Sequence, residues 1–275
     1  MTDRQLKPDL CVIGAGAGGL AVAAGAVQMG ARVVLIERGR MGGDCLNFGC
    51  VPSKALLWTA RIAALWRHGK ALGIAYDPPR IDFPKVADSV AEVITDLAPN
   101  DSEERFTALG VDVVRAEARF VDRRTAEAGG VAIRARRFVV ATGSEPVVPP
   151  IPGLSDLPYL TNETVFENRV LPRHLIVLGG GPVGIELAQA HRRLGAQVTV
   201  LDLGPLLPRE DPELAALLCA RLAAEGIALR PQVAVEAVAR TDEGVAVRLA
   251  GGGVIAGSHL LVAAGRRPAL AALDL

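Results

Sequence analysis

The sequence is poor in aromatic residues, cysteine and histidine, and it has no excess of charge of either sign. Aromatic side chains make up 4% of the 275 residues, and 30 basic residues balance 30 acidic ones. A nucleic-acid-binding surface usually shows a basic excess, and single-strand binding also uses stacking aromatics. A membrane-surface segment needs clustered basic residues. The composition therefore argues against a nucleic-acid partner and against a membrane partner.

The N-terminus has no apolar signal region. Residues 1–10, MTDRQLKPDL, are polar and of mixed charge, which predicts a cytoplasmic protein. The stretch Leu10–Gly30 contains no charged residue over 21 positions, which is long enough for a membrane-spanning helix. Six of those residues are glycine, and their spacing favours a turn between a strand and a helix over a membrane span.

Residues 10–37 predict a strand, a glycine-rich turn, a helix and a second strand. The strand Leu10–Ile13 precedes GAGAGG (14–19), and an alanine-rich helix ending near Gly30 leads to the strand Val33–Glu37. In a dinucleotide-binding turn the first glycine permits the tight turn, the second lets the backbone approach a pyrophosphate, and the third lets helix and strand pack closely. The helix N-terminus then binds the phosphates, and an acid after the second strand accepts from a ribose hydroxyl. The residues in these positions are Gly14, Gly16, Gly19 and Glu37.

The same unit recurs in the second half of the chain, at a constant offset. The strand Leu175–Leu178 precedes GGGPVG (179–184), and a helix ending near Gly195 leads to the strand Val198–Asp202. One G-x-G-x-x-G is weak evidence, because a turn can need glycine for backbone reasons alone. Two complete copies in the same context are strong evidence. The corresponding residues are Gly179, Gly181, Gly184 and Asp202.

Each unit continues into short alternating segments with turn signals, at 111–137 and 233–255, which predict antiparallel meanders. Each then returns through an apolar strand to a glycine, in FVVATGSEP (138–146) and LLVAAGRRP (260–268). The intervening EPVVPPIPG (145–153) contains four prolines, which is typical of a semi-rigid junction between domains.

The first unit also carries an insertion, at about 39–109, that the second lacks. It contains two cysteines and two helical stretches, Pro52–His68 and Phe83–Leu97. The predicted fold is therefore α/β, with two tandem Rossmann-like dinucleotide-binding domains at residues 1–150 and 151–275. Each domain combines a parallel sheet with an antiparallel meander, and the first has a helical, cysteine-bearing insert.

Cys45 and Cys50 stand five positions apart in GGDCLNFGCVPSK (42–54). A zinc site needs four clustered ligands, but the sequence has no C-x-x-C and only four histidines. Cys11 and Cys219 lie in apolar stretches, which predicts small buried core residues. A permanent structural disulfide fits a cytoplasmic protein poorly.

A redox-active pair fits these two cysteines better. Pro52 suits the first turn of a helix, so Cys50 stands near the positive end of that helix, which favours the thiolate. Lys54 adds positive charge four residues further on. A thiolate beside a partner thiol is the arrangement that thiol–disulfide exchange requires.

These motifs resemble those of the flavin-dependent pyridine nucleotide–disulfide oxidoreductases, which include dihydrolipoamide dehydrogenase, mercuric reductase and glutathione reductase. The likeness comprises GGDCLNFGCVPSK, both glycine turns, ATGS (141–144), GGGPVGIE (179–186) and AAGRRP (263–268), and it covers essentially the whole chain. The VPSK ending resembles the dihydrolipoamide dehydrogenase and mercuric reductase branch more closely. The resemblance implies a flavoprotein that passes electrons from NAD(P)H through FAD to the two cysteines, and on to a small disulfide, a dithiol or a metal ion.

The resemblance also implies a role for each site residue. Cys45 would attack the substrate, Cys50 would face the flavin as the charge-transfer thiolate, and Lys54 would lie near the flavin N5. Lys54 would also pair with Glu186, which stands far from it in the sequence. The FAD-binding residues would be Gly14, Gly16, Gly19, Glu37, Gly43, Lys54, Ala118, Thr142 and Gly143. The residues binding the nicotinamide dinucleotide would be Gly179, Gly181, Gly184, Asp202, Val233, Ala264, Gly265 and Arg266.

Asp202 bears on the choice of nicotinamide cofactor. An acid at this position favours NAD, because a 2′-phosphate would meet a like charge. Arg209, seven residues later, could serve a 2′-phosphate, but its setting in PREDPE is that of an ordinary surface arginine. We therefore predict NAD in preference to NADP.

Members of this family continue beyond the position of Leu275. The resemblance therefore implies that this chain lacks the segment completing the FAD domain, the dimerisation domain of these homodimers, and the His–Glu pair that serves as acid and base. No histidine here stands in that context, and His191 is expected at the surface. A second function thus stays open, a nucleotide-binding module that needs another chain for turnover. The remaining histidines, assigned no catalytic role, are His68, His174 and His259.

Overall fold

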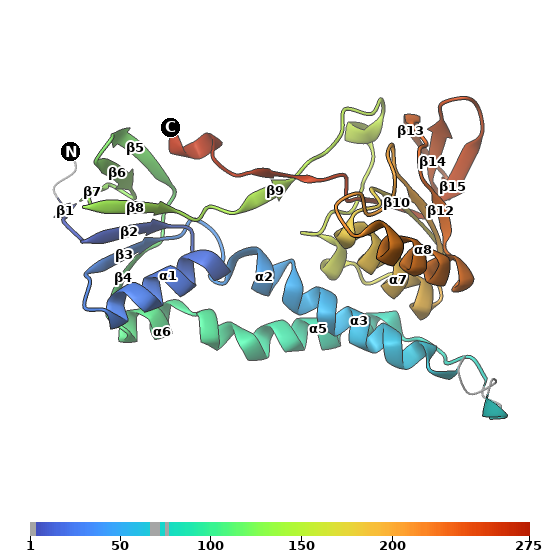
Figure 1. The fold of residues 1–275 in the computed structure, drawn as a ribbon, viewed down its shortest axis with the longest axis horizontal. Coiled ribbons are helices and arrows are strands. Elements are labelled where there is room, and N and C mark those ends of the chain that lie inside the picture. Colours follow the sequence, from blue (N-terminus) through green and yellow to red (C-terminus); the bar gives the residue numbers. More distant parts are fainter. Residues whose placement is uncertain (1–3, 67–71, 75–76) are drawn as a thin grey trace. The chain divides into compact units, whose positions relative to one another are not determined.

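The computed structural model describes residues 4–66, 72–74 and 77–275 (Figure 1). Residue contacts divide the chain into two compact units. The first contains residues 1–52, 92–145 and 267–275, and the second contains residues 53–91 and 146–266.

The first unit is built on a four-stranded parallel sheet in the order β4-β3-β2-β8. Its strands are β2 (Leu10–Ile13), β3 (Val33–Ile36), β4 (Val111–Val114) and β8 (Arg137–Val140). All four residues of β3 are buried, as expected for an inner strand of a parallel sheet covered on both faces. Helix α1 (Ala17–Gln28) packs on one face through Leu20 and Ala23.

The meander of the first unit covers the other face of this sheet. It comprises β5 (Ala118–Asp122), β6 (Thr125–Ala128) and β7 (Val131–Arg134), and β1 (Arg4–Leu6) adds to it parallel to β7. Cys11 and Ile13 of the sheet share a buried cluster with Ala118 and Ile133 of the meander. The prediction that the meander starts at Val111 was wrong, because residues 111–114 form β4, an edge strand of the parallel sheet.

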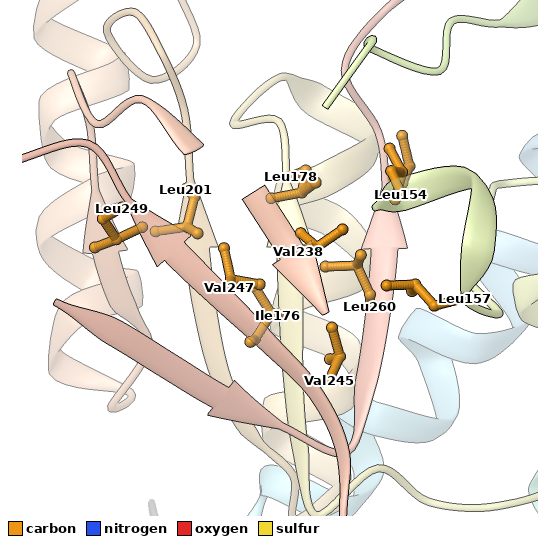
Figure 2. Close-up of a cluster of buried hydrophobic side chains, with 11 residues drawn as sticks. Leu154, Leu157, Ile176, Leu178, Leu201, Val238, Val245, Val247, Leu249 and Leu260 are labelled. Carbon is orange, nitrogen blue, oxygen red and sulfur yellow. The ribbon is translucent and has the colours of Figure 1, made fainter. Parts of the chain in front are cut away.

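The second unit repeats the same strand order, β12-β11-β10-β16. The strands are β10 (His174–Leu178), β11 (Gln197–Leu201), β12 (Ala228–Arg230) and β16 (His259–Val262). Their meander is β13 (Val235–Thr241), β14 (Gly244–Leu249) and β15 (Val254–Gly257). Figure 2 shows Ile176, Leu178 and Leu260 of the sheet facing Val245 and Val247 of the meander, and these residues belong to one buried cluster.

The helices agree with the periodicity of the sequence within a turn. Helix α3 (Cys50–Ala64) begins at Cys50 itself, and the predicted end of this helix at His68 lies outside the described residues. The bounds of α5 (Phe83–Leu97) are those predicted. The other helices are α2 (Gly43–Asn47), α6 (Glu103–Ala108), α7 (Pro182–Leu194) and α8 (Pro212–Ala224). The short remaining elements are β9 (Ser144–Pro146), β17 (Arg266–Pro268), and the 3₁₀ turns η2 (Ala98–Asp101), η3 (Leu154–Asp156), η4 (Val165–Glu167) and η5 (Ala271–Leu273).

Two predictions about single residues were wrong. His191 is fully buried rather than at the surface, since its ring lies 6.0 Å from that of Phe83 in α5. Its Nδ1 bonds to the Leu187 carbonyl at 2.8 Å, and burial lowers its pKa. Cys219 is only partly buried on α8. Cys11, by contrast, is buried as predicted, and this burial raises its pKa to about 12.

Among the described residues, no helix combines the length and the apolar character that crossing a membrane requires.

Candidate flavin and redox-cysteine site

The first glycine turn has the geometry that a dinucleotide requires. Gly14 has a φ of +105°, and a Cβ on it would lie 2.3 Å from the Ala141 carbonyl oxygen. A Cβ on Gly19 would lie 1.8 Å from the Gly14 oxygen. A Cβ on Gly16 would meet nothing nearer than the Gly43 Cα at 3.8 Å. Gly14 and Gly19 are therefore required by packing, whereas Gly16 leaves open space at the N-terminus of α1, where a pyrophosphate fits.

The second turn repeats this geometry. Gly179 has a φ of +115°, and a Cβ on it would lie 2.2 Å from the Ala263 oxygen. A Cβ on Gly184 would lie 2.0 Å from the Gly179 oxygen, and one on Gly181 would meet nothing within 4 Å. The open position again faces the N-terminus of a helix, because Gly181 is the N-cap of α7. The internal repeat is thus present in the backbone as well as in the sequence.

In each repeat, the acid that follows the second strand links the glycine turn to the next loop by hydrogen bonds. Glu37 accepts from the amides of Ala15 and Gly39, both at 2.6 Å. Asp202 accepts from the amides of Gly180 at 2.6 Å and Gly204 at 2.7 Å. Sequence reasoning missed these bonds, although the two pairs of donors occupy corresponding positions of the internal repeat. A carboxylate oxygen has two lone pairs, so each acid can still accept from a ribose hydroxyl.

Four of the predicted FAD-binding residues line one small pocket of the first unit. Gly14, Glu37, Ala118 and Thr142 surround a cavity of about 60 Å³. The pocket lies at the carboxyl ends of β2 and β3, which is where nucleotides bind in open α/β sheets. The rest of the lining is Ile13, Ile36, Arg38, Ala116, Glu117, Ala269, Ala272 and Leu273.

The cysteine-bearing segment is tied to the first glycine turn by its backbone. The Gly42 amide donates to the Ala15 carbonyl at 2.9 Å, and Gly42 forms a β-bridge with Gly16. A Cβ on Gly43 would lie 2.6 Å from the Gly16 Cα. Only glycine permits this approach, which sets the start of α2, and hence Cys45, beside the proposed pyrophosphate position.

Cys45 and Cys50 are both thiols and lie within reach of one another. Cys45 is partly buried and Cys50 is exposed. The pKa of Cys45 is raised, chiefly by its side-chain hydrogen bond with Cys50. Burial and the negative charge of Asp101 raise it further. Asp101 ends the 3₁₀ turn η2. No motif in the sequence would have drawn attention to it.

The predicted pair of Lys54 and Glu186 is present in the second unit. The Lys54 Nζ lies 2.9 Å from each carboxylate oxygen of Glu186. The two side chains are 61% and 39% exposed, so the pair lies in water-accessible surroundings. Exposed ion pairs of this kind add little stability.

The predicted nicotinamide-binding residues gather at the carboxyl ends of β10, β11 and β16. The Val233 amide donates to the Asp202 carbonyl at 2.8 Å, and a Cβ on Gly179 would lie 3.0 Å from the Ala264 amide. Gly265 has a φ of +121° and its carbonyl accepts from the Val147 amide at 2.9 Å. Arg209 is exposed. Within the described residues, no group of three or more His, Cys, Asp or Glu side chains could hold a metal ion.

Comparisons with known proteins identify relatives over almost the whole chain. Residues 8–274 match the family described as pyridine nucleotide-disulphide oxidoreductase. Mercuric reductase of Streptomyces lividans is 39% identical over 280 residues, covering 97% of this chain and 58% of the relative. That of Acidithiobacillus ferrooxidans is 39% identical over 273 residues, covering 97% and 50%. This chain thus spans about half the length of the curated relatives that it matches.

Comparison with solved structures also identifies similar proteins. The HOCl-induced flavoprotein disulfide reductase RclA from Escherichia coli superposes with a TM-score of 0.83 at 30% sequence identity, covering 96% of this chain and 58% of that chain. A copper(II) complex of an RclA mutant superposes with a TM-score of 0.85 at 29% identity, covering 98% and 58%.

Proposed function

The chain belongs to the pyridine nucleotide-disulphide oxidoreductase family, and from that premise we propose that it passes electrons from NAD(P)H through FAD to the Cys45–Cys50 pair. The observation that carries the proposal is the anchoring of the cysteine segment on the glycine turn: Gly42 donates to Ala15, and Gly43 packs against Gly16. A pure nucleotide-binding module would need no thiol pair at that turn.

Each of the two predicted domains would bind its own cofactor. Residues 1–150 would form the FAD domain, and residues 151–275 the NAD(P) domain. The open positions at Gly16 and Gly181 fit a pyrophosphate, because each stands at the N-terminus of a helix with free amides. FAD held at the first turn would supply a two-electron carrier between the nicotinamide and the Cys45–Cys50 disulfide.

The cysteines would carry the rest of the reaction. Two electrons and two protons convert the Cys45–Cys50 disulfide into two thiols. The Cys45 sulfur, as thiolate, would attack one sulfur of a substrate disulfide and release the other as a thiol. Cys50 would then attack the mixed disulfide, which frees the second substrate thiol and restores the Cys45–Cys50 bond. A soft metal ion could instead take the electron pair from the two thiolates.

We favour NAD over NADP as the reductant. Asp202 directly follows β11, and its two oxygens accept from the backbone amides of Gly180 and Gly204. If a nicotinamide dinucleotide binds at this turn, the 2′-phosphate of NADP would meet a like charge, whereas the 2′-hydroxyl of NAD would not. The residues proposed around the nicotinamide dinucleotide are Gly179, Gly181, Gly184, Asp202, Val233, Ala264, Gly265 and Arg266.

The acceptor would be a small disulfide, a dithiol or a metal ion, as the mercuric reductase and disulfide reductase relatives suggest. A cytoplasmic location suits this chemistry, since thiols are kept reduced there. A second function stays possible for the chain by itself, because it spans about half of its relatives. In that case it would bind the cofactors but need a further polypeptide for turnover.

The test is a visible absorption spectrum of the purified chain with FAD during anaerobic titration with NADH. We expect a bound flavin spectrum that bleaches on reduction, with a long-wavelength thiolate-to-flavin band. A Cys50→Ser variant should keep the flavin and lose the band, and a Cys45→Ser variant should keep flavin reduction and lose disulfide reduction. Absence of FAD binding by the wild-type chain would overturn the proposal, and flavin reduction without transfer to any acceptor would support the second function.

A further inference from the structure

Seven cationic side chains surround an open basin of about 860 Å³ in the first unit. We call it the arginine basin. Six of the cations are arginines, at 32, 123, 124, 134, 136 and 137, and the seventh is Lys7. Among the described residues, no acidic side chain lines it. The basin lies where β2, β3 and β8 begin, at the opposite end of the sheet from the Gly14 pocket.

Backbone hydrogen bonds hold the basin's segments together. The Asp9 amide donates to the Arg32 carbonyl at 2.9 Å, and the Arg137 amide donates to the Asp9 carbonyl at 3.2 Å. The Asp122 carboxylate accepts from the Arg124 amide at 2.7 Å in the turn between β5 and β6. The cations therefore lie at the ends of paired strands, so little ordering of the backbone is needed when a ligand binds.

Five of the seven cations form no ion pair with an acidic side chain of the described residues. In the part of the chain that the structure describes, the ion pairs of these cations go only to Asp9, which lies 3.4 Å from both Arg32 and Arg136. Those two arginine side chains are still 74% and 80% exposed. The whole chain has a net charge of zero, so the rest of it carries seven more acidic than basic side chains. The composition of the whole chain does not show this local excess, because acidic residues elsewhere balance it.

The chemistry of the basin matches a phosphate chain. Guanidinium groups bind phosphate oxygens in pairs of parallel hydrogen bonds, and Arg is preferred to Lys where such bidentate contacts are made. The volume falls in the range of small-ligand sites. Phe120 and Phe138, in edge-to-face contact with ring centroids 4.9 Å apart, add an apolar part to the lining.

We propose that the arginine basin binds a compact anion with several consecutive phosphates, either an inorganic oligophosphate or the triphosphate of a nucleotide. A long nucleic acid is disfavoured, because the cations converge on one basin and the remaining surface carries a negative excess. The proposal is independent of the flavin chemistry, since the basin and the Gly14 pocket occupy opposite ends of the sheet.

The test is isothermal titration of the full chain, saturated with FAD, with sodium tripolyphosphate. The wild type should bind one equivalent. An Arg134→Ser/Arg136→Ser variant should bind roughly tenfold or more weakly, since each removed arginine takes away charge-assisted bonds. The matched control is Arg105→Ser/Arg119→Ser, which removes two arginines of the same unit that lie outside the basin. It should bind like the wild type, and thermal unfolding should show that both variants are folded.

ATP serves as a second probe and identifies the source of the phosphates. Equal affinities for ATP and tripolyphosphate would show that the phosphate chain alone is recognised. Tighter binding of ATP that the basin substitutions abolish would assign a nucleotide. The proposal is overturned if neither probe saturates, if the basin variant binds as well as the wild type, or if a short DNA duplex binds more tightly than tripolyphosphate.

Discussion

Lys54 and Glu186 form an ion pair in which the lysine Nζ lies 2.9 Å from each carboxylate oxygen, although the two residues are distant from one another in the sequence. Both side chains are too exposed for the pair to add much to the free energy of unfolding. We expect the pair to orient the Lys54 ammonium, which we propose lies near the bound flavin.

A Lys54→Met variant should therefore reduce flavin more slowly with little loss of stability. We expect anaerobic stopped-flow rates with NADH to fall by roughly tenfold or more, because a positioned charge that acts in the transition state is lost. The melting temperature should move by only about 2–4 °C, which corresponds to at most about 1 kcal/mol. Lys85→Met is the matched control, since Lys85 pairs with Asp82 at the surface of the same unit. Equal rates in both variants would remove Lys54 from the mechanism.

The glycine turns predict two opposite results for alanine substitutions. In Gly16→Ala the new methyl group has space, so the chain should fold normally, but the methyl occupies the proposed pyrophosphate position. We expect the affinity for FAD to fall by roughly tenfold or more through lost phosphate contacts. In Gly19→Ala the methyl would lie 1.8 Å from the Gly14 oxygen, so the chain should lose stability. Fluorescence titration with FAD and urea unfolding separate the two effects. Unchanged FAD affinity in Gly16→Ala would argue against the proposed placement.

Much of this arrangement follows from local sequence patterns. The internal repeat predicts both glycine turns and both acids, because a turn, its helix and the next strand are close in sequence. The hydrogen bonds of Glu37 and Asp202 to turn amides could not be predicted in the same way. They depend on the backbone directions of Ala15 and Gly180, which become defined only when strand and turn pack.

Other features depend on contacts between distant segments. His191 has the pattern of a polar position on a helix, but its side chain is fully buried and Phe83 of a distant segment packs near its ring. The segment at Val111 reads equally well as a meander strand or a parallel strand, since a short apolar run does not distinguish them. Five of the seven cations of the arginine basin lie within residues 123–137, but only the fold brings Lys7 and Arg32 to them.

The thiol pair predicts a defined pH dependence of alkylation. The pKa of Cys45 is raised chiefly by its hydrogen bond with Cys50, and less by burial and by Asp101. In a Cys219→Ser background, Cys50→Ala should therefore move the rise of Cys45 alkylation with pH to lower pH. Asp101→Asn should move it in the same direction by a smaller amount. Iodoacetamide labelling followed by mass spectrometry measures both, and Cys11 should stay unlabelled because its pKa is about 12. A larger shift in Asp101→Asn than in Cys50→Ala would contradict this order of causes.

His191 predicts a loss of stability in mild acid. Burial lowers its pKa below the ordinary value of 6.5, so the unfolded chain binds a proton that the folded chain excludes. The stability that depends on a neutral His191 is fully present above pH 6.5. Below pH 6.5 the free energy of unfolding falls, by up to about 1.4 kcal/mol per pH unit. His259 acts with the same sign, because burial lowers its pKa too. Urea unfolding at pH 7 and pH 5 should show a smaller difference for His191→Leu than for the wild type. An identical difference would mean that His191 does not titrate in this window.

The carboxylate of Glu225 should contribute strongly to the free energy of unfolding. Its carboxylate accepts from Arg193 through two bonds of 2.8 Å and from Arg221 at 3.2 Å, and the Glu225 and Arg193 side chains are only 9% and 19% exposed. These arginines hold the pKa of Glu225 below its ordinary value of 4.5. Its contribution is therefore present above pH 4.5 and declines as the pH falls toward the lowered value.

At pH 7, Glu225→Gln should lower the free energy of unfolding by about 3 kcal/mol, because Arg193 is left largely buried without its partner. Glu236→Gln is the control, since its bond to Arg248 joins side chains that are 58% and 60% exposed, and it should cost less than about 1 kcal/mol. Urea unfolding of the two variants measures the difference. Similar costs would show that the burial of the Arg193–Glu225 pair does not strengthen it.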